Sequence, residues 1–320
     1  MDIPSIPVVF SNKQGLKLFG ILHAPEGGRA GDTAIVILSP GIKSRVAPHR
    51  LYVKMAKRFV EDGYTVFRFD FYGLGDSEGE VDVELTPDLY GSIQVGRYIE
   101  DTMAALDWLE AEHGLNKFII SGLCGGAITG LLAGARDRRI DSIIGLGIPV
   151  ILDSTRFRGM ASQFLTSKEL DEWRAGYIKN LLSLESWARL LTFKSDYRAL
   201  FKSFANPLRR LFGKTNGEEP PVSEPADDNF NELFPEAFEA FVATPRKMLL
   251  LFGEDDRLFF EFEEKFLGRH GSRFERYREL CDVQLVSGAR HIFELPEQLD
   301  EMLVKASSWL KEHYPLSPGA

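Results

Sequence analysis

The chain has 320 residues and an ordinary globular composition, with 44% hydrophobic and 27% charged residues. Its formal net charge of -9 argues against nucleic acid as a partner, because nucleic-acid-binding proteins usually carry a basic surplus. The sequence contains no run of about 18 or more apolar residues, which excludes a predicted membrane span. Its amino terminus lacks the form of a signal peptide, and its two cysteines, Cys124 and Cys281, do not make a disulfide framework. We therefore expect a cytoplasmic protein whose thiols are free to react.

The first half of the chain alternates short apolar strands with helices. We predict strands at residues 8–10, 16–23, 34–38, 65–69, 117–121 and 140–147, and helices at about 49–62, 94–113 and 127–135. The run at 34–38 is apolar throughout, as in a strand that is buried on both faces of a sheet. This order predicts an α/β architecture with a mostly parallel central sheet and helices on both sides.

The alternation stops after Pro149 and resumes near residue 247. Further strands are predicted at 247–252 and 283–286, with helices near 260–267 and at the carboxyl end of the chain. The residues between these parts, 150–244, are rich in aromatic side chains and have a largely helical pattern. We predict an α/β core at 1–149 and 245–320 and a helical cap at 150–244, placed over the strand ends where ligands bind in open α/β sheets.

The stretch Gly122-Leu123-Cys124-Gly125-Gly126 joins a predicted strand to a small-residue helix. This order is typical of a nucleophile elbow, a sharp turn that presents a nucleophile at the sheet edge. Side chains at Gly122 or Gly126 would collide with the neighbouring strand and helix. The helix amino terminus favours a thiolate at Cys124, and the Gly125 N–H can donate to an oxyanion. Cys124 is the predicted nucleophile, and the alternative interpretation is a buried, inert thiol.

Two polar turns follow the last two predicted strands, at residues 253–256 and 287–291. Because the carboxyl ends of parallel strands meet at one edge of a sheet, we expect both turns to lie near Cys124. His291 is then the predicted base and Asp256 the acid that orients it. The alternatives for the acid are Glu254, Asp255 and, less favoured, Asp153.

The turn at residues 39–42 follows the strand at 34–38, where this type of site places its second oxyanion donor. We assign that donor to the Ile42 N–H, beside Gly125. Arg45 and His49 lie just beyond this turn and are candidate contacts for an anionic substrate group; a helix-capping or surface role fits them equally well. The predicted chemistry needs no metal and no organic cofactor.

These motifs together carry a family resemblance. Gly41, the run at 70–77, the elbow, and the turns at 253–256 and 288–291 occur in the order typical of the α/β-hydrolase superfamily. The chain resembles its serine-aminopeptidase-like branch, and residues 45–50 with the Gly-Leu-Cys elbow look like the exosortase-A-associated hydrolases. The resemblance covers about residues 8–149 and 246–313 and implies an α/β-hydrolase fold with a catalytic triad. The elbow cysteine departs from the serine of most members and is similar to that of dienelactone hydrolases and polyhydroxyalkanoate synthases.

A cysteine nucleophile also narrows the predicted reaction. Attack by Cys124 forms a thioester acyl-enzyme. The free-energy change of this step is close to zero when the substrate is a thioester and unfavourable when it is an ordinary ester or amide. We therefore predict a hydrolase of an activated acyl ester or thioester, and the alternatives are an acyltransferase with the same triad or a non-catalytic binding protein of this fold. The basic residues between Arg189 and Lys214 make an acyl carrier protein or a coenzyme A thioester a candidate partner of this small-molecule acyl enzyme.

Overall fold

The computed structural model describes residues 4–25, 32–81, 85–154 and 228–316. By its contacts the chain divides into two compact units, Met1–Leu165 with Asn229–Ala320 and Thr166–Asp228. Most of the predicted cap, with its aromatic and basic residues, therefore lies outside the described residues, and its helical structure stays a prediction. The following description concerns the first unit.

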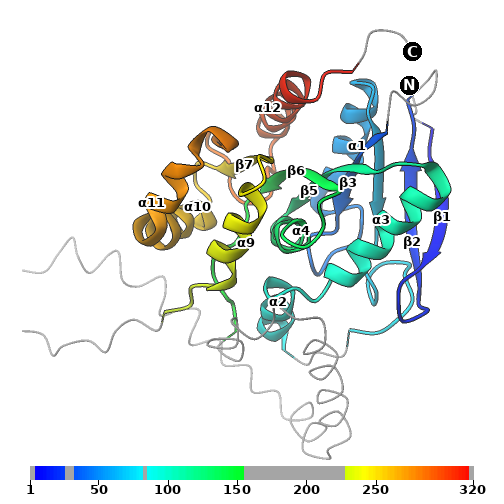
Figure 1. Ribbon diagram of the computed structural model, residues 1–320, viewed down its shortest axis with the longest axis horizontal. Coiled ribbons are helices and arrows are strands. Elements are labelled where there is room, and N and C mark those ends of the chain that lie inside the picture. The colour runs from blue at the N-terminus through cyan, green and yellow to red at the C-terminus, as the bar shows by residue number, and fades with distance from the viewer. Residues whose placement is uncertain (1–3, 26–31, 82–84, 155–227, 317–320) are drawn as a thin grey trace, which may run out of the picture. The chain divides into compact units, whose positions relative to one another are not determined.

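An eight-stranded sheet forms the centre of this unit (Figure 1), in the order β1-β2-β4-β3-β5-β6-β7-β8. Strands β3 to β8 run parallel to one another, and only β1 and β2 are antiparallel to their neighbours. The predicted mostly parallel sheet is thus confirmed. The strands are β1 (Ile6–Ser11), β2 (Lys17–His23), β3 (Thr33–Leu38), β4 (Thr65–Phe69), β5 (Lys117–Leu123), β6 (Ile140–Leu146), β7 (Lys247–Gly253) and β8 (Cys281–Val286).

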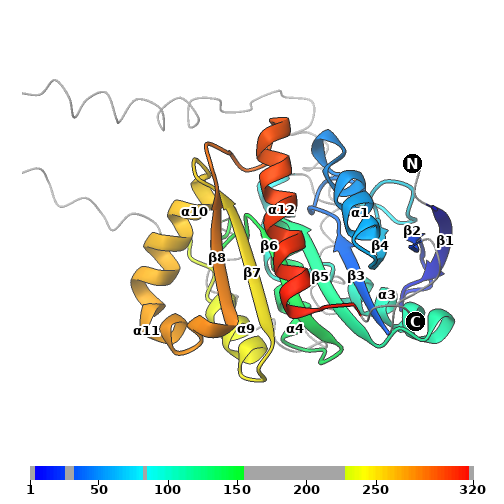
Figure 2. The same ribbon diagram turned by 90° about the horizontal axis from the view of Figure 1, so that it is seen from above.

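Helices cover both faces of the sheet (Figure 2). One face carries α1 (Leu51–Glu61) and α12 (Pro296–His313), whose apolar sides share one buried cluster with the sheet. The other carries α3 (Ile99–His113), α4 (Gly125–Gly134) and α9 (Leu233–Val242), which pack together around α4. The remaining helices are η1 (Pro48–Arg50), α2 (Thr86–Gln94), α10 (Arg257–Glu261), η4 (Phe262–Leu267), α11 (Gly268–Arg276) and η5 (Arg278–Leu280).

The structure differs from the sequence-based elements at two places. The helix predicted at 94–113 begins only at Ile99, because Gly96 adopts a φ of +108° that ends α2 and separates it from α3. Helix α9 lies within the range predicted as cap, yet it packs on α4 of the core, and Phe241 contacts Gly134. The core contacts therefore resume at Asn229, earlier in the chain than the predicted boundary at residue 245.

Candidate active site

Cys124 stands on a sharp turn between β5 and α4. Its backbone has φ 52° and ψ -111°, a combination that non-glycine residues rarely adopt, and its N–H donates to the Leu146 oxygen at 2.8 Å. A Cβ atom on Gly122 would lie 2.6 Å from the Gly126 carbonyl carbon, and one on Gly126 would overlap the Leu38 oxygen. The strand and helix therefore approach so closely that only glycine fits on either side, as the elbow pattern predicts.

A fully buried tyrosine supports this turn from below. The Leu123 N–H donates to the hydroxyl oxygen of Tyr52 on α1 at 2.7 Å. Burial raises the pKa of Tyr52, and the charge of Cys124 adds a smaller increase, so the Tyr52 hydroxyl stays neutral. The residue before Cys124 is thus fixed by a side chain more than 70 positions away, a contact that no local pattern indicates.

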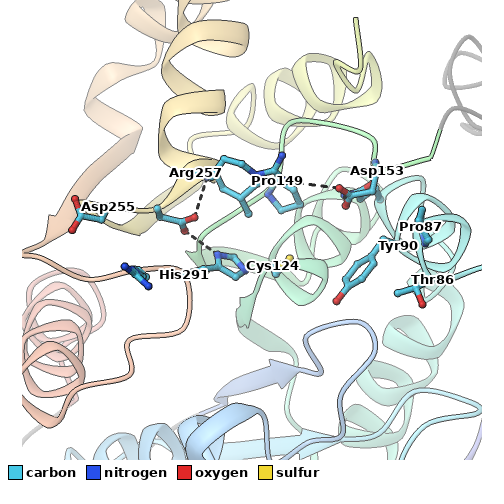
Figure 3. A pocket seen from close by; sticks show the side chains of 13 residues that line it. Thr86, Pro87, Tyr90, Cys124, Pro149, Asp153, Asp255, Arg257 and His291 are labelled. Atoms are coloured by element: carbon cyan, nitrogen blue, oxygen red, sulfur yellow. Dashed lines mark hydrogen bonds and ion pairs between the residues drawn. The ribbon is translucent and has the colours of Figure 1, made fainter. Parts of the chain in front are cut away.

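His291 and Asp256 meet beside Cys124 (Figure 3). The His291 Nδ1 atom lies 2.9 Å from the Asp256 Oδ2 atom, and the imidazole and the Cys124 side chain line the same cavity. Asp256 is 3% exposed, and its Oδ1 accepts the Leu258 N–H at 3.0 Å, which caps α10. With Nδ1 engaged by the carboxylate, the other ring nitrogen is free to face the sulfur. The structure therefore brings together the three residues that the sequence selects.

The surroundings of His291 keep its ring protonated. Burial by itself lowers the pKa of His291, but hydrogen bonds with Asp256 and Cys124, and the charges of both, raise it from 6.5 to about 10.

The other acidic candidates hold different positions. Glu254 accepts the Gly288 N–H at 2.9 Å, and the Asp255 N–H donates to the Ala289 oxygen at 2.9 Å; both contacts join the two turns without reaching His291. Asp153 bonds to Gln94 instead. Among the candidates for the acid, Asp256 alone has a hydrogen bond to the histidine.

Gly147 belongs to the site although the sequence did not single it out. It follows β6 with a φ of +50°, and a Cβ atom there would lie 2.8 Å from His291 and 3.0 Å from the Asp256 carboxylate. Any side chain would therefore push the histidine and the acid apart. In the sequence Gly147 is only a glycine directly after a buried strand. Its importance becomes visible in the structure, where β6 lies beside β7.

The two predicted oxyanion donors lie on adjacent segments. Gly125 begins α4, so its N–H has no acceptor within the helix. A Cβ atom on Gly125 would lie 3.1 Å from the Gly41 Cα atom, which places the turn carrying Ile42 against the elbow. Ile93 of α2 packs on both glycines. Donation by Gly125 and Ile42 to an oxyanion stays a prediction.

The predicted substrate contacts Arg45 and His49 are placed elsewhere. The Arg45 guanidinium pairs with the buried Asp70 carboxylate and with Asp76 at 2.7 Å, and it lies over the Phe19 ring at 4.5 Å. Neither Arg45 nor His49 lines the cavity at Cys124 among the described residues. The structure thus gives Arg45 a role in holding its own loop to the end of β4, and a contact of Arg45 or His49 with substrate stays a prediction.

A cavity of about 560 Å³ opens above Cys124. One wall comes from α2, a short helix that we did not predict from the sequence. The sequence does contain one indication of it, because Pro87 occupies one of the first helical positions, where proline is common. The opposite wall comes from the turns after β7 and β8. The lining residues are Thr86, Pro87, Tyr90, Gln94, Cys124, Pro149, Asp153, Asp255, Asp256, Arg257, Leu258, Arg290 and His291.

Two further properties concern the described part of the chain. In it, no three or more His, Cys, Asp or Glu side chains are grouped so as to hold a metal ion. None of the helices found there has the length and apolar character needed to cross a membrane.

Comparison with known proteins assigns the fold and the family. The profile of the serine aminopeptidase S33 family matches residues 32–196, about half of the chain. The chain belongs to this family. This α/β hydrolase nevertheless carries Cys124 at the elbow, where the family's name implies a serine. A search of curated protein sequences found no significant match.

Solved structures confirm the α/β-hydrolase fold of this S33-family hydrolase. It is similar to an esterase from Pyrococcus furiosus, with 17% identity and a TM-score of 0.57 over 97% of this chain and 93% of the other. The α/β hydrolase GrgF from Penicillium sp. sh18 has 18% identity and a TM-score of 0.57 over 97% and 99% of the two chains. An α/β serine hydrolase without lid from Xanthomonas campestris has 14% identity and a TM-score of 0.52 over 99% of each chain.

Proposed function

We propose that this hydrolase cleaves an activated acyl ester or thioester through Cys124, His291 and Asp256. The observation that carries the proposal is the position of the Cys124 sulfur. The sulfur stands on a strained elbow beside His291, whose Nδ1 atom bonds to the buried Asp256 carboxylate. All three residues line one cavity. A nucleophile, a base and an orienting acid in this order are the parts that covalent acyl transfer needs.

The acylation step follows from this arrangement. The Cys124 sulfur attacks the acyl carbon, and the carbonyl oxygen becomes an oxyanion held by the N–H groups of Gly125 and Ile42. The protonated His291 then gives its proton to the leaving group as the bond to that group breaks. Asp256 keeps the imidazole in the orientation that this proton transfer requires. The product is an acyl group bound to the sulfur as a thioester.

Hydrolysis of that intermediate uses the same residues in reverse roles. His291, now neutral, removes a proton from water as the water oxygen attacks the thioester carbon. The Cys124 sulfur leaves as a thiolate, the imidazole keeps the proton it took from water, and the free acid departs. The Cys124 thiolate is a better leaving group than an alkoxide. When the substrate carries a poor leaving group, the tetrahedral intermediate therefore tends to expel the thiolate and return to substrate. This property favours thioesters and activated esters over amides and simple esters.

The first prediction concerns a covalent adduct on Cys124. We expect p-nitrophenyl acetate and a series of acyl-coenzyme A thioesters to add one acyl mass to the wild type, measured by intact mass spectrometry. Cys124→Ala removes the acceptor sulfur, so its acyl mass should be absent. Cys281→Ala is the matched control, because Cys281 is fully buried and burial raises the pKa of its thiol; this variant should acylate like the wild type.

Each outcome decides a part of the proposal. Absence of any adduct, together with slow iodoacetamide labelling of Cys124 at neutral pH, contradicts a catalytic sulfur. An adduct that clears in water supports hydrolysis. An adduct that persists in water and clears with added alcohols or amines contradicts hydrolysis and assigns acyl transfer to the same triad.

A further inference from the structure

The loop after β6 carries a carboxylate for which the proposed reaction has no use. Asp153 lines the same cavity as Cys124, and 35% of its side chain is exposed (Figure 3). The acid that orients His291 is Asp256, so Asp153 is not needed for that task. A charged group at the wall of a reaction cavity, outside the triad, is positioned to select the substrate.

A set of hydrogen bonds that runs from the cavity wall into the core fixes this carboxylate. Gln94, which is 2% exposed, donates from Nε2 to the Asp153 Oδ2 atom at 2.7 Å and accepts the Asp153 N–H on Oε1 at 2.9 Å. The fully buried Asn231 in turn donates from Nδ2 to the Gln94 backbone oxygen at 2.9 Å. Three distant segments therefore converge to hold one carboxylate in place, as a preformed binding group requires.

Asp153 retains unused capacity to accept hydrogen bonds. A carboxylate offers about four acceptor sites. Within the described ranges the one hydrogen bond to this carboxylate comes from Gln94, and the closest guanidinium, that of Arg257, stands 4.0 Å away and is 67% exposed. The remaining sites are available to a group that enters the cavity.

The neighbours of Asp153 decide which group fits. A carboxylate on the substrate would be repelled by Asp153, and the attraction of Asp153 for an ammonium group is opposed by the Arg257 guanidinium, 4.0 Å from the carboxylate. A plain alkyl chain would displace water from Asp153 without replacing its hydrogen bonds, which is costly for a charged group. A neutral hydroxyl donates to the carboxylate at no such cost.

The position of Asp153 assigns this hydroxyl to one part of the substrate. Cys124 lies between His291 on one side and the wall with Tyr90 and Asp153 on the other (Figure 3). Because His291 must reach the leaving group to protonate it, the leaving group lies on its side and the acyl group on the other. We infer that Asp153 binds a hydroxyl group of the acyl chain, so that the substrates are hydroxyacyl thioesters or esters. This inference rests on the proposed acyl chemistry at Cys124.

The test compares matched substrates. The probes are N-acetylcysteamine thioesters of hexanoate, 3-hydroxyhexanoate, 6-hydroxyhexanoate and 3-aminohexanoate. We expect the wild type to favour at least one hydroxylated chain over hexanoate by about 10- to 100-fold in kcat/KM, the range of a hydrogen bond to a charged group. Asp153→Asn keeps the volume and can still accept from Gln94, but it turns a neutral amide N–H towards the cavity in place of a charged acceptor. The preference should therefore fall to the few-fold that a neutral hydrogen bond gives.

Asp255→Asn is the control, because it removes the same charge from another side chain of the same cavity and should leave the preference intact. Activity on hexanoate reports whether each variant is folded. Three outcomes each overturn the hydroxyl site while Cys124 still acylates: a wild-type ratio near one for both hydroxylated chains, an undiminished preference in Asp153→Asn, or a preference for the amino chain. Absence of an acyl adduct with every thioester overturns the proposed function and this inference together.

Discussion

His291 is the residue where opposing physical effects are clearest. Burial disfavours its charged form, yet the Asp256 carboxylate and the Cys124 side chain more than offset that effect and raise its pKa to about 10. The folded-state pKa thus lies above the unfolded value of 6.5. Its contribution to the free energy of unfolding is fully present below about pH 6.5 and is lost as the pH rises through about 10.

The second prediction follows from this raised pKa. At about pH 8 we expect a protonated His291 ring in the wild type and a neutral ring in Asp256→Asn, because the variant loses the carboxylate that stabilises the imidazolium. The ¹⁵N chemical shifts of the ring nitrogens measure this difference, with His291→Gln to assign the signals. The exposed surface residue His49 gives an internal control in the same spectra. A neutral wild-type His291 ring at this pH contradicts the raised pKa of His291.

Single residues also show which parts of the site can be predicted from sequence. Cys124, Asp256 and His291 stand in local patterns, each in a turn directly after a predicted strand, so parallel pairing alone brings them to one edge. Gln94, Tyr90 and Gly147 have no such pattern, because their roles depend on neighbours from distant segments. The ion pairs of Arg45 could not be predicted for the same reason: its partner Asp70 lies at the end of another strand.

At the scale of elements, the elbow depends on α1 as much as on α4. Helix α1 places the Tyr52 hydroxyl under the Leu123 N–H, and the start of α1 is tied to the preceding loop by the Tyr52 N–H, which donates to the Val46 oxygen at 3.3 Å. The Arg45 ion pairs hold that same loop. The strained backbone at Cys124 therefore persists because several elements restrain the residue before it.

The third prediction tests this support. Tyr52→Phe leaves the Leu123 N–H buried without an acceptor, so we expect the free energy of unfolding to fall by about 1–3 kcal/mol in urea titrations. The elbow should also loosen, which we expect to slow iodoacetamide labelling of Cys124. Tyr64→Phe is the matched control: it removes a hydroxyl that donates to the half-buried Tyr314 oxygen at 3.0 Å, far from the elbow. Equal labelling rates in both variants would show that Tyr52 stabilises the core without positioning the nucleophile.

At the scale of the whole molecule, the chain leaves and re-enters the core at one place. Residues Ile151 and Phe230 form an antiparallel bridge, the Leu152 N–H donates to the Asn229 oxygen at 2.7 Å, and the Asn231 N–H donates to the Val150 oxygen at 2.9 Å. The two segments on either side of residues 155–227 are therefore hydrogen-bonded neighbours. The core beyond them, including α9, belongs to one compact unit.

The fourth prediction follows from these adjacent segments. Replacing residues 155–227 with a short Gly/Ser linker should leave a core that unfolds in a single cooperative transition, because a short linker closes the gap at little entropic cost. Circular dichroism during thermal unfolding measures this. Replacing the whole predicted cap, 150–244, removes α9 and Asn231 from the core and should abolish the transition. The boundary at Asn229 is contradicted if the variant that lacks 155–227 fails to fold while the variant that lacks 150–244 folds.

The sequence by itself determined the strand and helix rhythm, the mostly parallel sheet, the elbow at Cys124 and the two turns with Asp256 and His291. These features are encoded in hydrophobic period, glycine spacing and chain order, which are local properties of the chain. Only the tertiary structure decided that Asp256 bonds to His291, that Arg45 serves its own loop, that α9 belongs to the core, and that Gln94 fixes Asp153 at the cavity wall. Those outcomes depend on contacts between segments far apart in sequence, where burial and hydrogen-bond geometry, rather than local pattern, select the partner.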